Sequence, residues 1–504
     1  MGELEDLRKE VDKINAQIQE LFVKRMEISE KIAKIKIEQG LPVYQKSREE
    51  QILQKIDEQE EKYGNYTKVL FKKMMELSRA RQSEVRGFYG LLGKTLSHSY
   101  STEIHAALGC EDYNLVEAEE DELENILRDS EYCGLNVTIP YKKTILDYCE
   151  EWSDEVKEIG SANTLVKKFS HQAEDGKLVY HWVAHNTDAA GFEELLRFGR
   201  MSMTNQKVLI LGAGGAAAAV FYVARKQRAL DAVMVSRHGS DNYQNLDRHY
   251  DADIIVNCTP VGMYPDITEQ LIDLRPFQKC KGVIDLVYNP RRTRLLQQAE
   301  SLGIPCIDGL YMLVAQAAHA EAIFFGKDYD SKQVRDIYKK ISAEKKNLVL
   351  IGMPGAGKSK IASEIGRMSG REVIDLDLEI QKRYNKSPEQ IIKADGEETF
   401  REIESTVLKD VCQMKGIVLA TGGGTPLNAI NKQLLKCDGY VCYISRDIRQ
   451  LDLVGRPLAN EDNIDYLFKE RLPHYRAAMD ASYVNESSIS GIAQTIYSDF
   501  LQKA

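Results

Sequence analysis

Hydrophobic and polar positions alternate in two different ways along the chain, and the change divides it into three segments. Residues 1 to about 86 carry apolar residues spaced by three and four, which predicts long helices. Residues 88–340 and 346–504 instead show short apolar runs separated by helical stretches, a pattern typical of α/β units. We therefore expect a multidomain chain, in which an all-α helical bundle is followed by two α/β units.

The first segment has an apolar seam that is interrupted by a cation, Arg25. The seam residues are Leu4, Leu7, Val11, Ile14, Ile18, Leu21, Ile28, Ile32 and Ile35. An arginine buried in such a seam needs an anionic partner to offset its desolvation, whereas in a dimerising coiled coil it can extend to solvent. Further polar residues flank the seam or lie on the following helices: Arg8, Lys36, Arg48, Glu49, Ser78 and Gln82.

This segment resembles the all-helical chorismate mutases through LRKEV, KRMEI, KIK, LPV, SREEQIL and LFKKMMELSRARQ. The resemblance implies that Arg8, Arg25 and Arg48 hold the two carboxylates of chorismate. It also implies a homodimer formed through the helical domain, in which Arg8 reaches the site of the other protomer. The product would be prephenate.

The remaining polar residues of the segment would surround the reacting ring. By the same resemblance, Lys36 and Gln82 face the ether oxygen, Glu49 faces the ring hydroxyl, and Ser78 lines the site. A pericyclic rearrangement needs only a clamp for one conformer and donors aimed at the oxygen where charge develops. A second interpretation stays open, in which the helical segment is a non-catalytic dimerisation or effector-binding module.

The middle segment contains KVLILGAGGAAAAVFYVA, an apolar strand, a glycine turn and a helix of small residues. The turn glycines Gly212, Gly214 and Gly215 predict a Rossmann nucleotide-binding domain. The next strand, AVMVS, is followed by Arg237, and no acidic residue stands there to bind a ribose hydroxyl. A guanidinium at this place suits a 2′-phosphate and favours NADPH over NADH.

The same segment resembles the shikimate dehydrogenases through GLLGKTLSHSYS, GLNVTIPYKK, GSANTL, HNTDAAGF, NCTPVGM, IDLVYNPRRT and GLYMLVAQAA. The resemblance implies a substrate domain over about 88–190 and an NADP-binding domain over about 191–310, with C-terminal helices that return to the first. It implies the substrate contacts Ser99, Ser101, Thr138, Asn163, Tyr288 and Gln316, and the further cofactor contacts Ala216 and Gly309.

Lys142 and Asp188 would form the catalytic pair of this dehydrogenase. Reduction of the ring ketone of 3-dehydroshikimate requires a hydride at one face and a proton at the developing alkoxide. A lysine partnered by a carboxylate is suited to donate that proton. Oxidation of quinate is the alternative that we keep for this domain.

The third segment begins with NLVLIGMPGAGKSKIASEIG, which has the GxxxxGKS spacing of a phosphate-binding loop. The residues of this loop that we expect to bind the nucleotide are Gly352, Gly355, Gly357, Lys358 and Ser359. Backbone N–H groups of such a loop surround phosphates, while the lysine reaches the terminal ones and the serine can bind magnesium. The loop predicts an NTPase or a kinase without naming the acceptor, and we expect a P-loop kinase fold for this segment.

VIDLDLEI, DGEETFREIE, LATGGGT, GRPL and RLPHYRAAMD resemble the shikimate kinases in order and spacing. The resemblance implies shikimate contacts at Asp377, Arg401, Gly423 and Arg471, with shikimate 3-phosphate as the product. It places Asp375 near Mg²⁺ and Arg456 in a lid over ATP. Asp377 would orient or deprotonate the attacking hydroxyl. A kinase for another small hydroxylated acid is the alternative.

Composition limits the partners. A net charge of −10 and a pI near 5.6 disfavour nucleic acid and anionic membranes, so we expect neither. Nine cysteines without a CxxC pair predict reduced thiols and, with no apolar export segment, a cytoplasmic enzyme. We expect NADPH/NADP⁺, ATP and Mg²⁺ as cofactors, and small acids as substrates.

Overall fold

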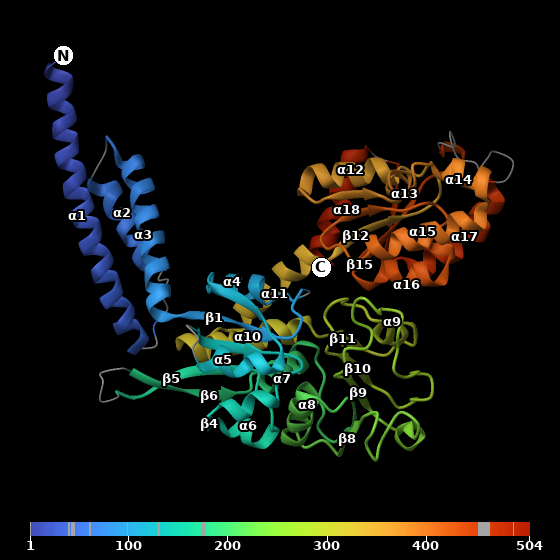
Figure 1. Ribbon diagram of the computed structural model, residues 1–504. Helices are drawn as coiled ribbons and strands as arrows, with labels where there is room; N and C mark the ends of the chain where they lie inside the picture. The colour runs from blue at the N-terminus through green and yellow to red at the C-terminus, as the bar shows by residue number, and fades with distance from the viewer. Residues whose placement is uncertain are drawn as a thin grey trace. The chain divides into compact units, whose positions relative to one another are not determined.

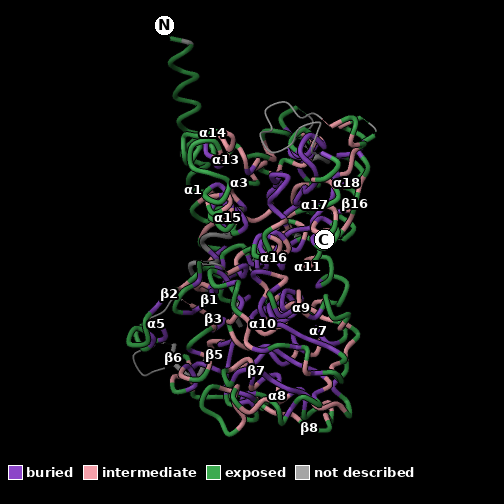
Figure 2. The backbone as a smooth tube through the Cα atoms, turned by 90° about the vertical axis from the view of Figure 1, so that its right-hand side faces the viewer, coloured by how far each residue is buried: buried purple, intermediate pink, exposed green. Residues whose placement is uncertain are grey.

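The structure is a computed structural model that describes residues 2–38, 41, 46–59, 62–97, 99–128, 132–172, 178–451, 464–486 and 488–503. The chain forms two compact units. The first comprises Met1–Gly191 and Ala315–Ser331, and the second comprises Phe192–Val314 and Lys332–Ala504. Figure 2 shows buried residues concentrated in the sheets and exposed residues along the N-terminal part of the first helix.

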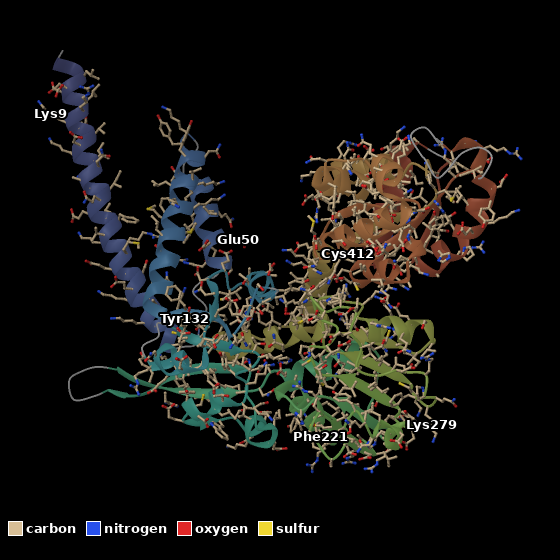
Figure 3. The ribbon with its side chains drawn as sticks, turned by 45° about the vertical axis from the view of Figure 1, so that its right-hand side comes forward. Lys9, Glu50, Tyr132, Phe221, Lys279 and Cys412 are labelled. Carbon is tan, nitrogen blue, oxygen red and sulfur yellow. The ribbon has the colours of Figure 1, made fainter. Side chains whose placement is uncertain are left out.

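The N-terminal segment is helical, as predicted. Its helices are α1 (Gly2–Glu38), α2 (Lys46–Gln59) and α3 (Gly64–Arg86). No glycine or proline occurs from residue 3 to residue 38, so nothing in the sequence interrupts the 37-residue α1. Its apolar seam residues are 40% to 65% exposed, and Figure 3 shows Lys9 pointing away from the same helix.

A mixed sheet follows in the first unit, with strand order β2-β1-β3-β5-β6-β4. Its strands are β1 (Phe88–Gly93), β2 (Tyr113–Glu117), β3 (Tyr132–Val137), β4 (Glu151–Trp152), β5 (Thr164–Gln172) and β6 (Leu178–His185). Its helices are α4 (Ser101–Leu108), α5 (Leu123–Arg128) and α6 (Asp154–Ile159), while α7 (Asp188–Phe198) and α10 (Leu310–Phe325) contribute residues to both units. Leu92 and Leu135 pack on one face of the sheet, whereas Tyr89 packs against Phe324 on the other.

The second unit begins with a parallel five-stranded sheet of order β11-β10-β9-β7-β8. Its elements are β7 (Lys207–Leu211), α8 (Gly215–Lys226), β8 (Asp231–Val235), β9 (Ile254–Asn257), β10 (Gly282–Asp285), α9 (Arg294–Ser301) and β11 (Cys306–Asp308). The predicted strand, glycine turn and helix therefore lie at β7 and α8. We call this part the nucleotide half.

A second parallel sheet follows α11 (Ser331–Lys345), with order β13-β14-β12-β15-β16. Its strands are β12 (Asn347–Ile351), β13 (Val373–Asp375), β14 (Val418–Ala420), β15 (Gly439–Ser445) and β16 (Ala481–Val484). Its helices are α12 (Lys358–Ser369), α13 (Leu376–Tyr384), α14 (Pro388–Asp395), α15 (Glu397–Val411), α16 (Ala429–Cys437), α17 (Ile464–Ala478) and α18 (Ile489–Lys503).

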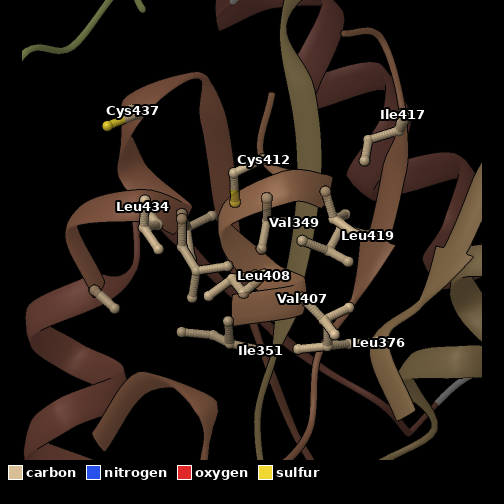
Figure 4. Packing of buried hydrophobic residues seen from close by; sticks show 14 of the residues in the cluster. Val349, Ile351, Leu376, Val407, Leu408, Cys412, Ile417, Leu419, Leu434 and Cys437 are labelled. Carbon is tan, nitrogen blue, oxygen red and sulfur yellow. The ribbon is translucent and has the colours of Figure 1, made fainter. Parts of the chain in front are cut away.

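Alternating residues of β12 pack on opposite faces of this sheet. Leu348 and Leu350 pack against α12 and α18, while Val349 and Ile351 pack against the helices of the other face. Figure 1 shows helices on both faces of this sheet. Figure 4 shows the second cluster, in which Leu408 of α15 lies close to both strand residues. Both faces are covered, which explains why LVLI is a continuous apolar run.

These elements confirm the predicted fold class, a helical segment followed by α/β units. The nine cysteines are free thiols in the structure. Among the described residues, no helix is long and apolar enough to cross a membrane.

Candidate functional site

Lys142 and Asp188 form a close ion pair in the first unit. Lys142 lies in the turn after β3, and Asp188 is the first residue of α7. The Lys142 Nζ donates to the Asp188 Oδ2 at 2.5 Å, and the two side chains are only 16% and 6% exposed. A lysine held on a shielded carboxylate has one N–H direction fixed and the others free for a ligand.

A buried amide network fixes the other oxygen of Asp188. Asn163, directly before β5, donates its Nδ2 to the Asp188 Oδ1 at 2.9 Å and to the Thr187 Oγ1 at 2.9 Å. The same Nδ2 lies 3.2 Å from the Oε1 of Gln316, on α10. The structure thus gathers the predicted residues Asn163, Asp188, Lys142 and Gln316 at one site.

The sequence analysis missed a second layer behind this network. The hydroxyl of Tyr113 donates to the Asn136 Oδ1 at 2.7 Å, and the Asn136 Nδ2 donates to the Thr164 Oγ1 at 3.0 Å. Thr164 in turn donates to the Asn163 Oδ1 at 3.2 Å. Burial raises the pKa of Tyr113 well above its usual range, which keeps this hydroxyl a proton donor. The NVT motif contained Asn136, but nothing local pointed to Tyr113.

Three further predicted substrate contacts lie near the ends of the strands of the same sheet. The Ser99 Oγ donates to the Ser101 Oγ at 3.0 Å, where Ser101 begins α4. Thr138 directly follows β3, and its N–H donates to the Leu92 carbonyl oxygen at 2.9 Å. Short hydroxyls at such chain turns are suited to bind a carboxylate or a ring hydroxyl.

The nucleotide half places its predicted residues at the carboxyl ends of parallel strands. Gly212 follows β7 with φ of 117°, a conformation that disfavours other residues. Gly214 and Gly215 form the start of α8, with Ala216 in the first turn, and the N–H groups of a first helical turn suit a diphosphate. Arg237 is exposed just after β8.

The last two predicted residues of this half, Tyr288 and Gly309, flank the other strands. Tyr288 is half-buried after β10, and Gly309 is buried before α10. A Cβ at Gly309 would collide with the Leu286 backbone, so no larger residue fits. Nucleotides bind outside the carboxyl ends of parallel strands in sheets of this kind, which is where these residues lie.

The third segment contains a cavity of about 890 Å³. Its lining includes the predicted residues Gly355, Gly357, Lys358, Ser359, Asp375, Asp377, Arg401, Gly423 and Arg471. The cavity therefore unites the phosphate-binding loop with the predicted acceptor residues. Gly352 lies at the end of β12 with φ of 145°.

The phosphate-binding loop contains a buried cation and a hydroxyl–carboxylate pair. The Lys358 Nζ donates to the carbonyl oxygens of Gly352 and Met353 at 2.9 and 3.0 Å. The Ser359 Oγ donates to the Asp375 Oδ2 at 2.6 Å. The lysine fits the terminal phosphates of ATP, and the Ser359 and Asp375 oxygens fit a hard cation such as Mg²⁺.

Two arginines supply positive charge to the opposite part of the cavity. Arg401 donates to the Oε2 of Glu404 at 2.9 Å and to the Oε1 of Glu397 at 3.0 Å. Burial lowers its pKa, but the two glutamates outweigh burial and raise it. The Arg471 Nε is buried and has no hydrogen-bond partner among the described residues. Such a donor fits an anionic group of the acceptor.

Two residues that the sequence analysis did not name hold the acceptor side in place. The buried Glu404 accepts a hydrogen bond from the Thr425 Oγ1 at 2.6 Å as well as the one from Arg401. The Tyr475 hydroxyl donates to the Gly423 carbonyl oxygen at 2.5 Å. Glu404 is buried on α15 and Tyr475 is buried on α17, and no local motif singled out either residue.

The helical segment brings four of its predicted residues together. Arg25 donates to the Met74 carbonyl oxygen at 3.0 Å and also contacts the Ser78 Oγ. Burial lowers the pKa of Arg25, and Glu49 partly opposes this effect. The Lys36 Nζ donates to the Gln82 Oε1 at 3.1 Å in a buried position. The cation in the seam therefore faces α3.

The remaining predictions of the helical and kinase segments lie elsewhere. Arg8 is exposed and pairs with Glu5 at 3.7 Å, so it does not join Arg25 within one chain. Arg48 is exposed and lies at 3.5 Å from the Gln51 Oε1. Arg456, the predicted lid residue, lies outside the described residues.

Comparison with known proteins supports all three segments. Models of chorismate mutase type II, of the shikimate dehydrogenase substrate binding domain and of shikimate kinase match residues 7–83, 91–165 and 354–501. A shikimate dehydrogenase (NADP(+)) of Clostridium perfringens is 34% identical over 275 residues, covering 50% of this chain and 97% of that protein. The one from Caldicellulosiruptor bescii is 35% identical, covering 47% and 88%.

A solved chorismate mutase/shikimate 5-dehydrogenase fusion protein from Clostridium acetobutylicum is 34% identical, with a TM-score of 0.46, covering 51% of this chain and 97% of that one. The sequence matches carry the assignment, together with the Lys142–Asp188 pair and the phosphate-binding loop. The names of both dehydrogenase relatives specify NADP(+), and the third segment matches a kinase model. The chain belongs to the shikimate dehydrogenase family, and it is a multifunctional shikimate-pathway enzyme that also carries chorismate mutase and shikimate kinase domains.

Proposed function

We propose that the chain reduces 3-dehydroshikimate to shikimate with NADPH, phosphorylates shikimate to shikimate 3-phosphate with Mg-ATP, and converts chorismate to prephenate. The observation that carries the proposal is the Lys142–Asp188 pair inside the Asn163 network. The kinase cavity supports the second step, because it holds a phosphate-binding lysine and two acceptor-side arginines. The product of the first step is then the substrate of the second.

In the proposed reduction, Lys142 donates a proton from Nζ to the ketone oxygen of 3-dehydroshikimate as that oxygen becomes an alkoxide. Asp188 holds this ammonium by its Oδ2, while Asn163 fixes the other oxygen of the carboxylate. The bound NADPH supplies the hydride. Ser99 and Ser101 would hold the substrate carboxylate, which leaves Lys142 to act at the ring.

In the proposed phosphoryl transfer, Asp377 orients the attacking hydroxyl of shikimate. Arg401 and Arg471 hold its carboxylate, which would give a partner to the buried Arg471 Nε, for which the described residues offer none. Lys358 would bind the terminal phosphates, and the oxygens of Ser359 and Asp375 would hold Mg²⁺. Positioning and charge compensation suffice for such a transfer.

In the proposed rearrangement, Arg25 binds a carboxylate of chorismate, and Lys36 and Gln82 act on the ether oxygen. Their mutual contact at 3.1 Å shows that both side chains point to the same buried place. Arg8 would come from the partner of a homodimer, because it is exposed in its own chain. Nine exposed apolar residues on α1 would be covered in the same dimer.

Two variants of the full chain test the first two steps against each other. Lys142→Ala should lower the reduction rate by roughly 10²-fold or more and leave phosphorylation of supplied shikimate intact. Lys358→Ala should abolish phosphorylation and leave reduction intact. If Lys142→Ala reduced 3-dehydroshikimate as fast as the wild-type chain, Lys142 would not be the proton donor.

The helical segment needs a separate assay, because a non-catalytic dimerisation module would have the same helices. Chorismate supplied to the purified dimer should yield prephenate, and Gln82→Ala should lower the turnover by about 10²-fold. No prephenate above the uncatalysed background would favour the non-catalytic module. Binding of aromatic amino acids would then be measured.

A further inference from the structure

The nucleotide half buries two apolar residues in the core of the kinase. Tyr264 and Ile267 lie between β9 and β10, and they are only 5% and 4% exposed. Both belong to the hydrophobic cluster that contains Leu434 and Cys437 of α16. Figure 4 shows Cys437 at the margin of this cluster. The two α/β parts thus share one apolar core rather than a solvated linker.

The Tyr264 side chain is also held by polar groups of the kinase. Its hydroxyl donates to the Cys412 carbonyl oxygen at 2.7 Å and to the Asp438 Oδ2 at 3.1 Å. The Lys415 Nζ lies 4.3 Å from the centre of its ring. Burial, followed by the charge of Asp438, raises the pKa of Tyr264 well above its usual range. An aromatic anchor with a satisfied hydroxyl is typical of energetically central interface residues.

Two consecutive arginines extend the contact. The Arg291 N–H donates to the Asp438 Oδ1 at 2.9 Å, and the Arg292 N–H donates to the Cys437 carbonyl oxygen at 2.8 Å. The Arg292 guanidinium pairs with Asp480 at 2.9 Å, and its side chain is only 19% exposed. We call Tyr264, Ile267, Arg291 and Arg292 the docking patch.

Arg291 joins this contact to the cofactor side of the nucleotide half. Its guanidinium pairs with Asp308 at 2.9 Å, and the Asp308 Oδ1 accepts from the Leu310 N–H at 2.9 Å. Asp308 directly precedes Gly309, a proposed cofactor contact. One arginine therefore binds both the kinase and the segment beside the proposed NADP site.

We infer that the nucleotide half and the kinase form one cooperative unit through the docking patch, so that NADP⁺ bound to the first stabilises the second. Interfaces between domains usually permit relative motion unless they are apolar and well packed. Here a shared apolar core and the partly buried Arg292–Asp480 ion pair join the parts, and removal of one partner would leave the other charge uncompensated. A ligand that binds only the folded unit then protects every activity that the unit carries.

The test rests on the proposed function and follows kinase activity, with shikimate and Mg-ATP, during heating of the full chain with and without NADP⁺. NADP⁺ should slow the loss of kinase activity by about tenfold, against a ceiling of about 100-fold at 100 times its Kd. The NADP⁺ concentration for half-maximal protection should equal that for protection of dehydrogenase activity.

In a double variant, Tyr264→Phe with Arg292→Ala, NADP⁺ should no longer protect kinase activity during heating, but it should still protect dehydrogenase activity. Arg275→Ala is the matched control, because this exposed arginine pairs with Asp273 of the nucleotide half. In the Arg275→Ala chain, NADP⁺ should protect both activities. If the double variant does not fold, the wild-type comparison still decides.

Kinase activity that decays at one rate with and without NADP⁺, while the dehydrogenase is protected, would overturn the inference. Protection at a different NADP⁺ concentration would overturn it as well, because NADP⁺ would then act at the kinase itself. A chain that lacks either activity at the start would instead contradict the proposed function.

Discussion

Asn163 is the residue through which most of the dehydrogenase site is held. Its Nδ2 faces oxygens of Asp188, Thr187 and Gln316, and its Oδ1 accepts from the Thr187 N–H at 2.7 Å. A side chain with this many buried contacts cannot be truncated without leaving acceptors unpaired. The orientation of Asp188, and so of Lys142, depends on it.

Asn163→Ala should therefore lower the kcat/KM for 3-dehydroshikimate by roughly 10- to 100-fold. Steady-state rates of NADPH oxidation measure the effect. Phosphorylation of shikimate by the same preparation is the internal control and should not change. A dehydrogenase with wild-type kcat/KM would show that the network does not position the catalytic pair.

The buried Asp285 should make the stability of the nucleotide half fall as the pH rises. Burial raises its pKa to about 7, although Thr293, Val287 and Asn257 donate to its carboxyl group. The unfolded chain releases this proton near pH 3.9. The stabilisation that comes from the neutral carboxyl is thus fully present below about pH 4 and is lost as the pH rises through 7.

Asp285→Asn keeps a neutral group at every pH. The free energy of unfolding of the variant, relative to the wild-type chain, should therefore rise between pH 4 and 8 by up to about 4 kcal/mol. Urea unfolding followed by circular dichroism across this range measures it. A difference that stays constant with pH would contradict the buried neutral carboxyl.

At the scale of elements, we expect α1 to form a dimer contact. Its apolar seam is exposed in the single chain, so a second α1 is the proposed cover. Ile14→Glu with Ile18→Glu should produce monomers and abolish prephenate formation, because Arg8 would no longer reach its site. Sedimentation velocity measures the state. Ala16→Glu, on the opposite face, should stay dimeric.

A variant with both glutamates that remained dimeric would place the dimer contact elsewhere. The dehydrogenase and kinase rates of the Ile14→Glu, Ile18→Glu variant should match those of the wild-type chain, because both sites lie outside α1. A loss of all three activities would show misfolding rather than dissociation. The Ala16→Glu chain distinguishes the effect of added charge from that of the seam.

Elements and local motifs could be predicted from the sequence, whereas contacts between distant segments could not. The β12 strand, the phosphate-binding loop and α12 follow one another within GMPGAGKS and its flanks, so spacing alone predicted Lys358 and Ser359 at the start of a helix, where α12 begins. Tyr264 and Cys412 are 148 residues apart, and only the fold brings them together. Tyr113 and Glu404 escaped prediction because each occupies an inward position that a core residue would fill equally well.

At the scale of the whole molecule, the account joins three reactions in one chain and two of them in one cooperative unit. The docking patch lies in the dehydrogenase segment and contacts Asp438 and Asp480 of the kinase. Covalent fusion alone would not require such a contact. The kinase is therefore expected to lose stability when it is separated from the nucleotide half.

The most direct test supplies 3-dehydroshikimate, NADPH and Mg-ATP to the full chain and follows the products by mass spectrometry. We predict equal amounts of oxidised NADPH, consumed ATP and shikimate 3-phosphate, and we predict that shikimate accumulates when ATP is left out. Without NADPH, no phosphorylated product should form. Phosphorylation of 3-dehydroshikimate in the absence of NADPH would contradict the account. Oxidation of NADPH that forms neither shikimate nor shikimate 3-phosphate would contradict it as well.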